Sequence, residues 1–133
     1  MNILQISFHT APMNSLGVND GGGLNVYVES ISKELAKDNI SAEVIDCRVL
    51  NPFNPDLIIE SVKKTGKLLV LDGSWKNCGF AGEVIASVSE KFVDFKAPPR
   101  RMGLKDSPAP TSKPLEEDYY INIHDIVNNA KSI

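Results

Sequence analysis

The sequence predicts a three-layer α/β domain, with a mostly parallel sheet of four to five strands between helices on both faces. Short apolar runs alternate along the chain with longer amphipathic segments, and glycine-bearing segments follow two of the runs. The composition, 42% hydrophobic and 23% charged, is that of a globular protein. Strands that alternate with helices indicate right-handed βαβ crossovers of the Rossmann-like kind. We expect residues 1–133 to form a single domain.

The first part of the chain contains a strand, a loop, a helix and a second strand. Residues 3–8 are an apolar run that predicts a buried strand, and residues 10–23 predict a long loop rich in glycine and asparagine. A helix that closes at residues 38–39 is predicted by one apolar stripe, made of Leu24, Val28, Ile31 and Leu35. Residues 42–47 predict the second strand.

Two further helix–strand units follow. Asn54 and Pro55 are typical of a helix start, and Gly66 is typical of the end of that helix. Residues 67–71 predict the third strand, and residues 72–75 predict a turn. The third helix is predicted by an apolar side that carries Phe80, Val84, Val88, Phe92 and Phe95.

The last part of the chain is rich in proline. Residues 98–104 predict a short final strand. The three prolines that come next, Pro108, Pro110 and Pro114, are expected to exclude regular structure as far as Leu115. Residues 121–127 then begin a closing helix.

Charge and cysteine usage exclude several classes of protein. The net charge of −3 is spread along the chain and favours neither nucleic acid nor an anionic membrane as a partner. The apolar runs are too short to span a bilayer, and residues 1–4 lack the basic start of a signal peptide, so we expect a cytoplasmic location. Cys47 and Cys78 form no metal-binding or redox motif, and we expect free thiols.

One set of landmarks spans most of the chain. It comprises residues 40–46 and 61–66, Trp75 ahead of Gly79 to Glu83, then Arg101, Pro108, Pro110, Leu115–Glu116 and Ile126–Val127. In this order the landmarks, from about residue 32 to residue 133, resemble the C-terminal domain of the transketolase superfamily. The segment is most similar to the β chains of pyruvate or branched-chain 2-oxo acid dehydrogenase E1. We assign residues 38–133 to this type of domain.

The transketolase resemblance implies a non-catalytic assembly or dimerisation module. In the resembled enzymes, thiamine diphosphate and magnesium lie between the other two domains, and the C-terminal domain supplies dimer contacts and docks the acyltransferase core. The acidic motif of that cofactor site does not occur in this sequence. We therefore expect no catalytic residue, no metal site and no bound cofactor in this chain alone. A homodimer, the thiamine-binding domains and the acyltransferase core are the expected partners.

The start of the chain has a second resemblance. Residues 6–12 and 20–28 resemble the opening of glycosyltransferases of the GT-B fold, most closely the family 4 type that uses nucleotide sugars. This resemblance covers residues 1–37 and implies a diphosphate-binding loop at Gly21, Gly22 and Gly23. Glycines allow a phosphate to approach the backbone, and the N-terminus of the next helix favours an anion. A fragment of such a transferase is the alternative function, and either a hybrid or a divergent chain fits both resemblances.

Other candidates have weaker signals. His9 ends the first strand and lies by the cleft in the glycosyltransferase interpretation, while His124 is expected to face solvent. Gly79, Gly82 and Glu83 begin a helix that packs against neighbouring domains in the resembled transketolase family. Arg100 and Arg101 either clamp a phosphate or form a solvated strand edge, and the two aromatic residues near the turn, Trp75 and Phe80, are expected in the core or an interface.

Overall fold

A computed structural model describes residues 2–7, 23–47 and 49–133 of the chain. These residues contain four strands and five helices, which alternate up to the last strand and end with two helices in succession. Their bounds are β1 Asn2–Ser7, α1 Gly23–Lys37, β2 Ser41–Asp46, α2 Asp56–Thr65, β3 Leu68–Trp75, α3 Phe80–Ser89, β4 Arg100–Leu104, α4 Lys113–Tyr119 and α5 Ile123–Lys131.

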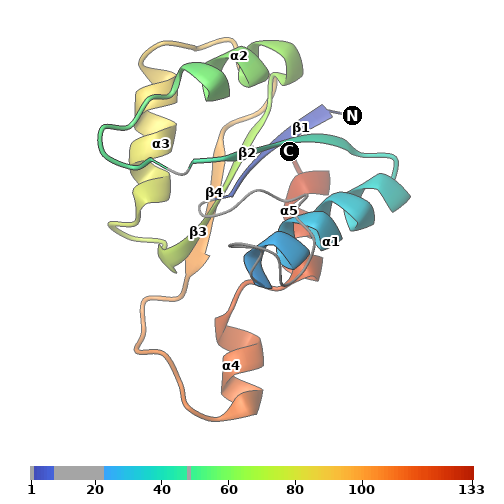
Figure 1. Ribbon diagram of the computed structural model, residues 1–133, viewed down its shortest axis with the longest axis vertical. Helices are drawn as coiled ribbons and strands as arrows, with labels where there is room; N and C mark the ends of the chain where they lie inside the picture. The colour runs from blue at the N-terminus through green and yellow to red at the C-terminus, as the bar shows by residue number, and fades with distance from the viewer. Residues whose placement is uncertain (1, 8–22, 48) are drawn as a thin grey trace.

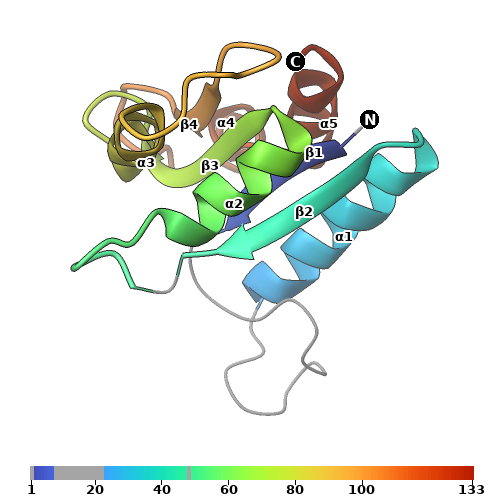
Figure 2. The same cartoon turned by 90° about the horizontal axis from the view of Figure 1, so that it is seen from above.

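The four strands form one parallel sheet in the order β2-β1-β3-β4 (Figure 1). β1 lies beside β2 along its whole length and pairs on its other side with the first residues of β3. Figure 2 shows α1 and α2 on opposite sides of this sheet. The parallel, helix-covered sheet predicted from the sequence is confirmed, and the strand order, which the sequence left open, places β2 and β4 at the edges.

β3 divides the hydrophobic core into two layers, because successive side chains of a strand point to opposite faces. Leu69 and Leu71 pack with α1 and α5, whereas Leu68 and Val70 pack with α2 and α3. The first of these two buried clusters contains Ile31, Leu35, Ile40, Ile126, Val127, Ala130 and Ile133, and the second contains Ile58, Ile59, Val62, Ala81, Val84 and Val88. A strand buried on both faces is typical of parallel sheets and explains the continuous apolar run of residues 68–71.

Two predicted boundaries in the middle of the chain are wrong. β3 continues through the expected turn as far as Trp75, because Trp75 pairs with Leu104 of β4 after a register shift. α3 ends at Ser89 and does not extend to Phe95. The rings of Phe92 and Phe95 stack edge to face beyond the helix, with centroids 5.0 Å apart, and pack against the second cluster.

The proline-rich segment also differs from the prediction. α4 begins at Lys113, with Pro114 in its first turn, where the missing N–H of proline has no helical partner to lose. Asn54 does mark the start of α2, since its Oδ1 accepts a hydrogen bond from the Asp56 N–H at 2.9 Å. The predicted closing helix is α5, and the side chain of Asn122 caps it. None of the helices that the structure describes has both the length and the apolar character of a membrane span.

Candidate functional site

Folds of this type bind ligands at the carboxyl edge of the sheet, where strands lead into helix N-termini. At this edge the carboxylate of Asp72 on β3 is buried, with 9% of the residue exposed. Its Oδ2 accepts a hydrogen bond from the Ala81 N–H in the first turn of α3, and its Oδ1 accepts one from the Ser74 N–H, both at 2.9 Å. The N-terminus of α3, which would favour a bound anion, is therefore already occupied by a carboxylate of the chain itself.

The backbone is closely packed around Asp72. A Cβ atom on Gly79, the residue before α3, would lie 2.3 Å from the Trp75 carbonyl oxygen and 2.7 Å from the Ser74 hydroxyl. A Cβ atom on Gly103 of β4 would lie 2.8 Å from the Cα of Lys76. The structure thus explains both glycines by close approach of neighbouring backbone. The junction between β3, β4 and α3 is filled by atoms of the chain.

The same edge carries α4 on an extended connection. The indole Nε1–H of Trp75 donates to the hydroxyl of Tyr119 at 3.1 Å, and that hydroxyl donates to the carbonyl oxygen of Ser107 at 3.0 Å. Tyr119 is 6% exposed, whereas Trp75 is 54% exposed. The polar atoms of both rings are satisfied within the chain, so covering the exposed indole with apolar groups would leave no unpaired donor.

The rest of α4 is held by polar contacts at the surface. Lys105 and Asp118 form an ion pair of 2.5 Å, and both side chains are largely exposed. Asn77 donates to the carboxylate of Asp106 in the connection that leads to the helix. A groove of about 480 Å³ runs along the other side of α4 and is lined by Lys113, Glu116, Glu117, Tyr120, Ile121 and Asn122.

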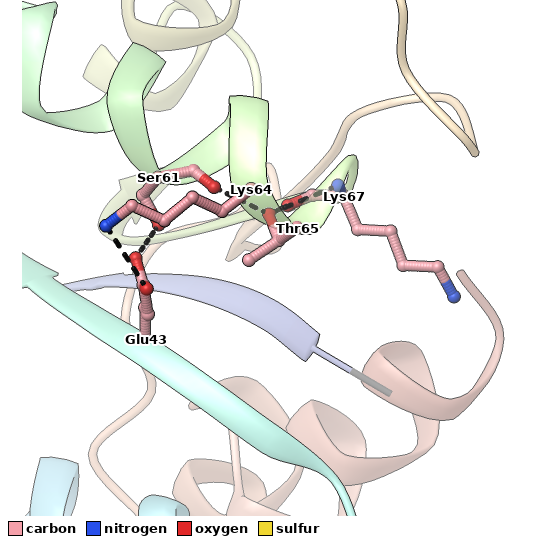
Figure 3. Close-up of polar contacts among 5 residues, drawn as sticks. All are labelled: Glu43, Ser61, Lys64, Thr65 and Lys67. Atoms are coloured by element: carbon pink, nitrogen blue, oxygen red, sulfur yellow. Dashed lines mark hydrogen bonds and ion pairs between the residues drawn. The ribbon is translucent and has the colours of Figure 1, made fainter.

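A second polar cluster joins α2 to the edge strand β2 (Figure 3). The carboxylate of Glu43 accepts a hydrogen bond from the Ser61 hydroxyl and lies 3.6 Å from the Lys64 ammonium. The Thr65 hydroxyl lies 3.0 Å from the carbonyl oxygen of Ser61. Ser61 is only 2% exposed. Its hydroxyl is shielded from any substrate and bonded to a carboxylate, so the cluster is suited to fixing α2 on the sheet and not to nucleophilic chemistry.

The predicted phosphate loop lies mostly outside the described residues. Gly21, Gly22 and His9 are outside them, and Gly23 is the first residue of α1. A phosphate site at these glycines therefore stays a prediction. His124 lies in the first turn of α5 and is exposed, as expected.

The paired arginines of β4 do not converge on one point. The guanidinium of Arg100 donates to the Ser132 hydroxyl at 2.6 Å, whereas that of Arg101 lies over Gly82 of α3. The two side chains thus serve opposite faces of the sheet, which does not suit a shared phosphate clamp. Glu83 accepts a hydrogen bond from Ser87 one turn later in α3.

The remaining candidates are placed as follows. Phe80 stacks edge to face on Phe53, with ring centroids 5.3 Å apart, and packs against the second cluster, whereas Trp75 stays half exposed. Cys47 is half-buried and Cys78 is exposed, and neither of the two forms a disulfide. Across residues 2–7, 23–47 and 49–133, no three His, Cys, Asp or Glu side chains gather closely enough to hold a metal ion.

Comparison with known protein families decides between the resemblances for most of the chain. The model of the transketolase C-terminal domain matches residues 21–126. The chain belongs to this family. The match includes α1, although the glycosyltransferase resemblance also covers that helix, and residues 1–20 lie outside it. The glycosyltransferase resemblance of residues 1–37 stays a prediction.

Three curated proteins similar to this chain are 2-oxo acid dehydrogenase subunits. The chain is 34% identical over 123 residues to the pyruvate dehydrogenase E1 component subunit beta of Rickettsia bellii, covering 86% of the chain and 38% of the relative. It is 37% identical over 100 residues to the mitochondrial pyruvate dehydrogenase E1 component subunit beta of Dictyostelium discoideum, covering 74% and 28%. The mitochondrial 2-oxoisovalerate dehydrogenase subunit beta of the same organism is 32% identical over 114 residues, covering 85% and 30%.

The chain thus spans between 28% and 38% of the length of these relatives. A solved structure described as split gene transketolase, inactive beta4 tetramer, superimposes with a TM-score of 0.73 over 98% of the chain and 37% of the solved chain. At 20% identity this likeness establishes the fold alone. Sequence family and fold agree on a transketolase C-terminal domain.

Proposed function

We propose that residues 1–133 form one domain and serve as a non-catalytic assembly module of a thiamine-diphosphate-dependent dehydrogenase of the pyruvate or branched-chain 2-oxo acid type. The observation that carries this proposal is the position of Asp72. Its carboxylate caps α3 at the carboxyl edge of the sheet, where folds of this type hold a ligand. This buried carboxylate therefore stabilises the domain and is not directed toward a substrate.

The described residues do not fit the cofactor of the resembled enzymes. A magnesium ion bound to a diphosphate requires carboxylate or carbonyl oxygens that converge on one point. No acidic cluster of that kind lies within the described part of the chain. In this proposal the cofactor is held by thiamine-binding domains that lie outside residues 1–133. The relatives are long enough to contain such domains, because this chain matches at most 38% of the length of those compared.

Calorimetry with thiamine diphosphate and magnesium tests the cofactor part of the proposal. We expect no saturable heat when both are added to the purified chain at millimolar concentration. An intact E1 enzyme titrated under the same conditions is the positive control. Saturable binding in the micromolar range would contradict the proposal.

Reconstitution tests the assembly part. A pyruvate dehydrogenase E1 whose β subunit is truncated before its C-terminal domain is co-expressed with and without this chain. We expect the chain to co-purify with the truncated enzyme and to restore 2-oxo acid decarboxylation. A Glu60→Lys variant of the chain, altered at an exposed residue of α2, is the matched control and is expected to behave as the wild type. A chain that neither co-purifies nor restores activity, while the truncated enzyme remains folded, would contradict an assembly role.

A further inference from the structure

α4 is a helix with little to stabilise it inside one molecule. It has seven residues, and Tyr119 is the single buried residue among them. Isolated helices of this length are marginal in water, and helices in proteins depend mainly on packing of an apolar face. Leu115 lies one turn before Tyr119 on the same side of the helix, yet it is 60% exposed. Figure 1 shows α4 set apart from the sheet, beyond the carboxyl ends of β3 and β4.

Glu116 places an acid in the first turn of α4, as the helix dipole favours, but one charge pair of the helix has the less favourable order. Lys113 is the first residue of the helix, and Glu117 follows one turn later on the same face. A helix is stabilised by acids near its N-terminus and bases near its C-terminus, and an acid placed before a base at this spacing is the better order. No ion pair holds Lys113 or Glu117 within the described part of the chain. The order of Lys113 and Glu117 therefore adds little to the stability of α4 within one chain.

An antiparallel partner helix of the same sequence places Lys113 and Glu117 in a more favourable arrangement. About a two-fold axis between two copies of α4, residue 113 of one copy faces residue 117 of the other, and the reverse contact forms at the same time. Both ion pairs join opposite charges, and the two helix dipoles are antiparallel. Tyr120 lies on the same face as these residues, is exposed, and lines the groove of about 480 Å³ along α4.

We propose that α4 is a self-association surface on which a second copy of this chain binds, with reciprocal Lys113–Glu117 ion pairs and Tyr120 covered in the groove. This inference rests on the proposed assembly role and names the surface for one of its partners. A standard interface buries about 800 Å² on each partner. A face built on one short helix offers less, so we expect a dissociation constant in the range of roughly 10–100 μM.

Charge reversal tests this pairing directly by sedimentation equilibrium. Lys113→Glu alone and Glu117→Lys alone each turn both ion pairs of the homodimer into repulsions, and we expect at least about a tenfold weaker association for each. An equimolar mixture of the two variants restores both pairs in the heterodimer, so we expect wild-type association to within about threefold. Lys63→Glu and Glu90→Lys reverse exposed charges on α2 and just after α3 and are the matched controls, for which we expect no change.

Three results would overturn the inference. The first is a wild-type chain that stays monomeric at about 300 μM, well above the expected dissociation constant. The second is a dimer that Lys113→Glu and Glu117→Lys do not weaken more than the controls do. The third is a mixture no better associated than either variant, with circular dichroism showing that both are folded. In each case the assembly role itself would still be decided separately, by reconstitution and calorimetry.

Discussion

α3 and α4 follow neighbouring strands at the carboxyl edge of the sheet but are stabilised in different ways. The start of α3 is capped by Asp72, and the helix buries Ala81, Val84 and Val88 against the sheet. α4 buries Tyr119 alone and otherwise depends on exposed polar contacts. The contrast shows that the part of this edge around α3 is stabilised within a single chain. The part around α4 presents apolar and charged groups to solvent, and a partner would cover them in the proposed dimer.

The largest loss of stability is expected when the Asp72 carboxylate at the start of α3 is removed. Asp72→Ala leaves the buried Ala81 N–H and the part-buried Ser74 N–H without their acceptor, and hydrogen bonds to charged groups contribute about 1.5–3 kcal/mol each. We expect the free energy of unfolding to fall by about 3 kcal/mol, measured by urea denaturation. Asp94→Ala removes an exposed carboxylate after α3 and is expected to change the free energy of unfolding by less than about 0.5 kcal/mol. Equal losses for the two variants would remove the contrast.

A smaller effect is expected from the glycine that precedes α3. Gly79→Ala places a methyl group against backbone, with the Trp75 carbonyl oxygen 2.3 Å from the new Cβ, so the junction must open. Overpacking of this kind costs typically about 1–3 kcal/mol, and we expect about 2 kcal/mol in the same denaturation experiment. Gly73→Ala is the matched control, because nothing lies within 4 Å of a Cβ there. A Gly79→Ala chain as stable as the control would show that the junction is loosely packed.

The smallest loss of stability is expected around α4, and it is confined to that helix. Tyr119→Phe removes the hydroxyl that joins Trp75 to Ser107, and a neutral hydrogen bond contributes about 1 kcal/mol. We expect faster amide exchange in α4 and unchanged exchange in α3, measured by hydrogen exchange with mass spectrometry. Faster exchange in α3 as well would show that the stabilities of α3 and α4 are coupled, and would contradict the contrast between the two helices.

The parallel sheet and its flanking helices could be predicted because their signals are local. The apolar run of residues 68–71 and the stripe from Leu24 to Leu35 each follow the period of one element. The role of Asp72 could not be predicted in the same way. Its partner Ala81 lies nine residues later, and the sequence predicts a turn at residues 72–75. Likewise Glu43 and Ser61 are 18 residues apart and meet only when α2 packs on the sheet.

The candidate site was predicted less completely than the fold. The landmarks from residue 40 onward identified the family correctly, whereas α4 was missed because Pro114 was interpreted as a helix breaker. A proline in the first helical turn and a proline in a loop give the same local signal, and only the residues that follow decide between them. The residues now proposed for self-association, Lys113 and Glu117, therefore had no predicted helix on which to share a face.

We infer that α3 is stable within one chain, whereas α4 is stabilised by association with a second copy. Hydrogen exchange at two protein concentrations, about 1 μM and about 300 μM, tests it most directly, since the expected dissociation constant lies between them. We predict that protection of the amides of Lys113–Tyr119 rises with concentration, while protection of Phe80–Ser89 is high and constant. Equal protection of α4 at both concentrations would contradict the account.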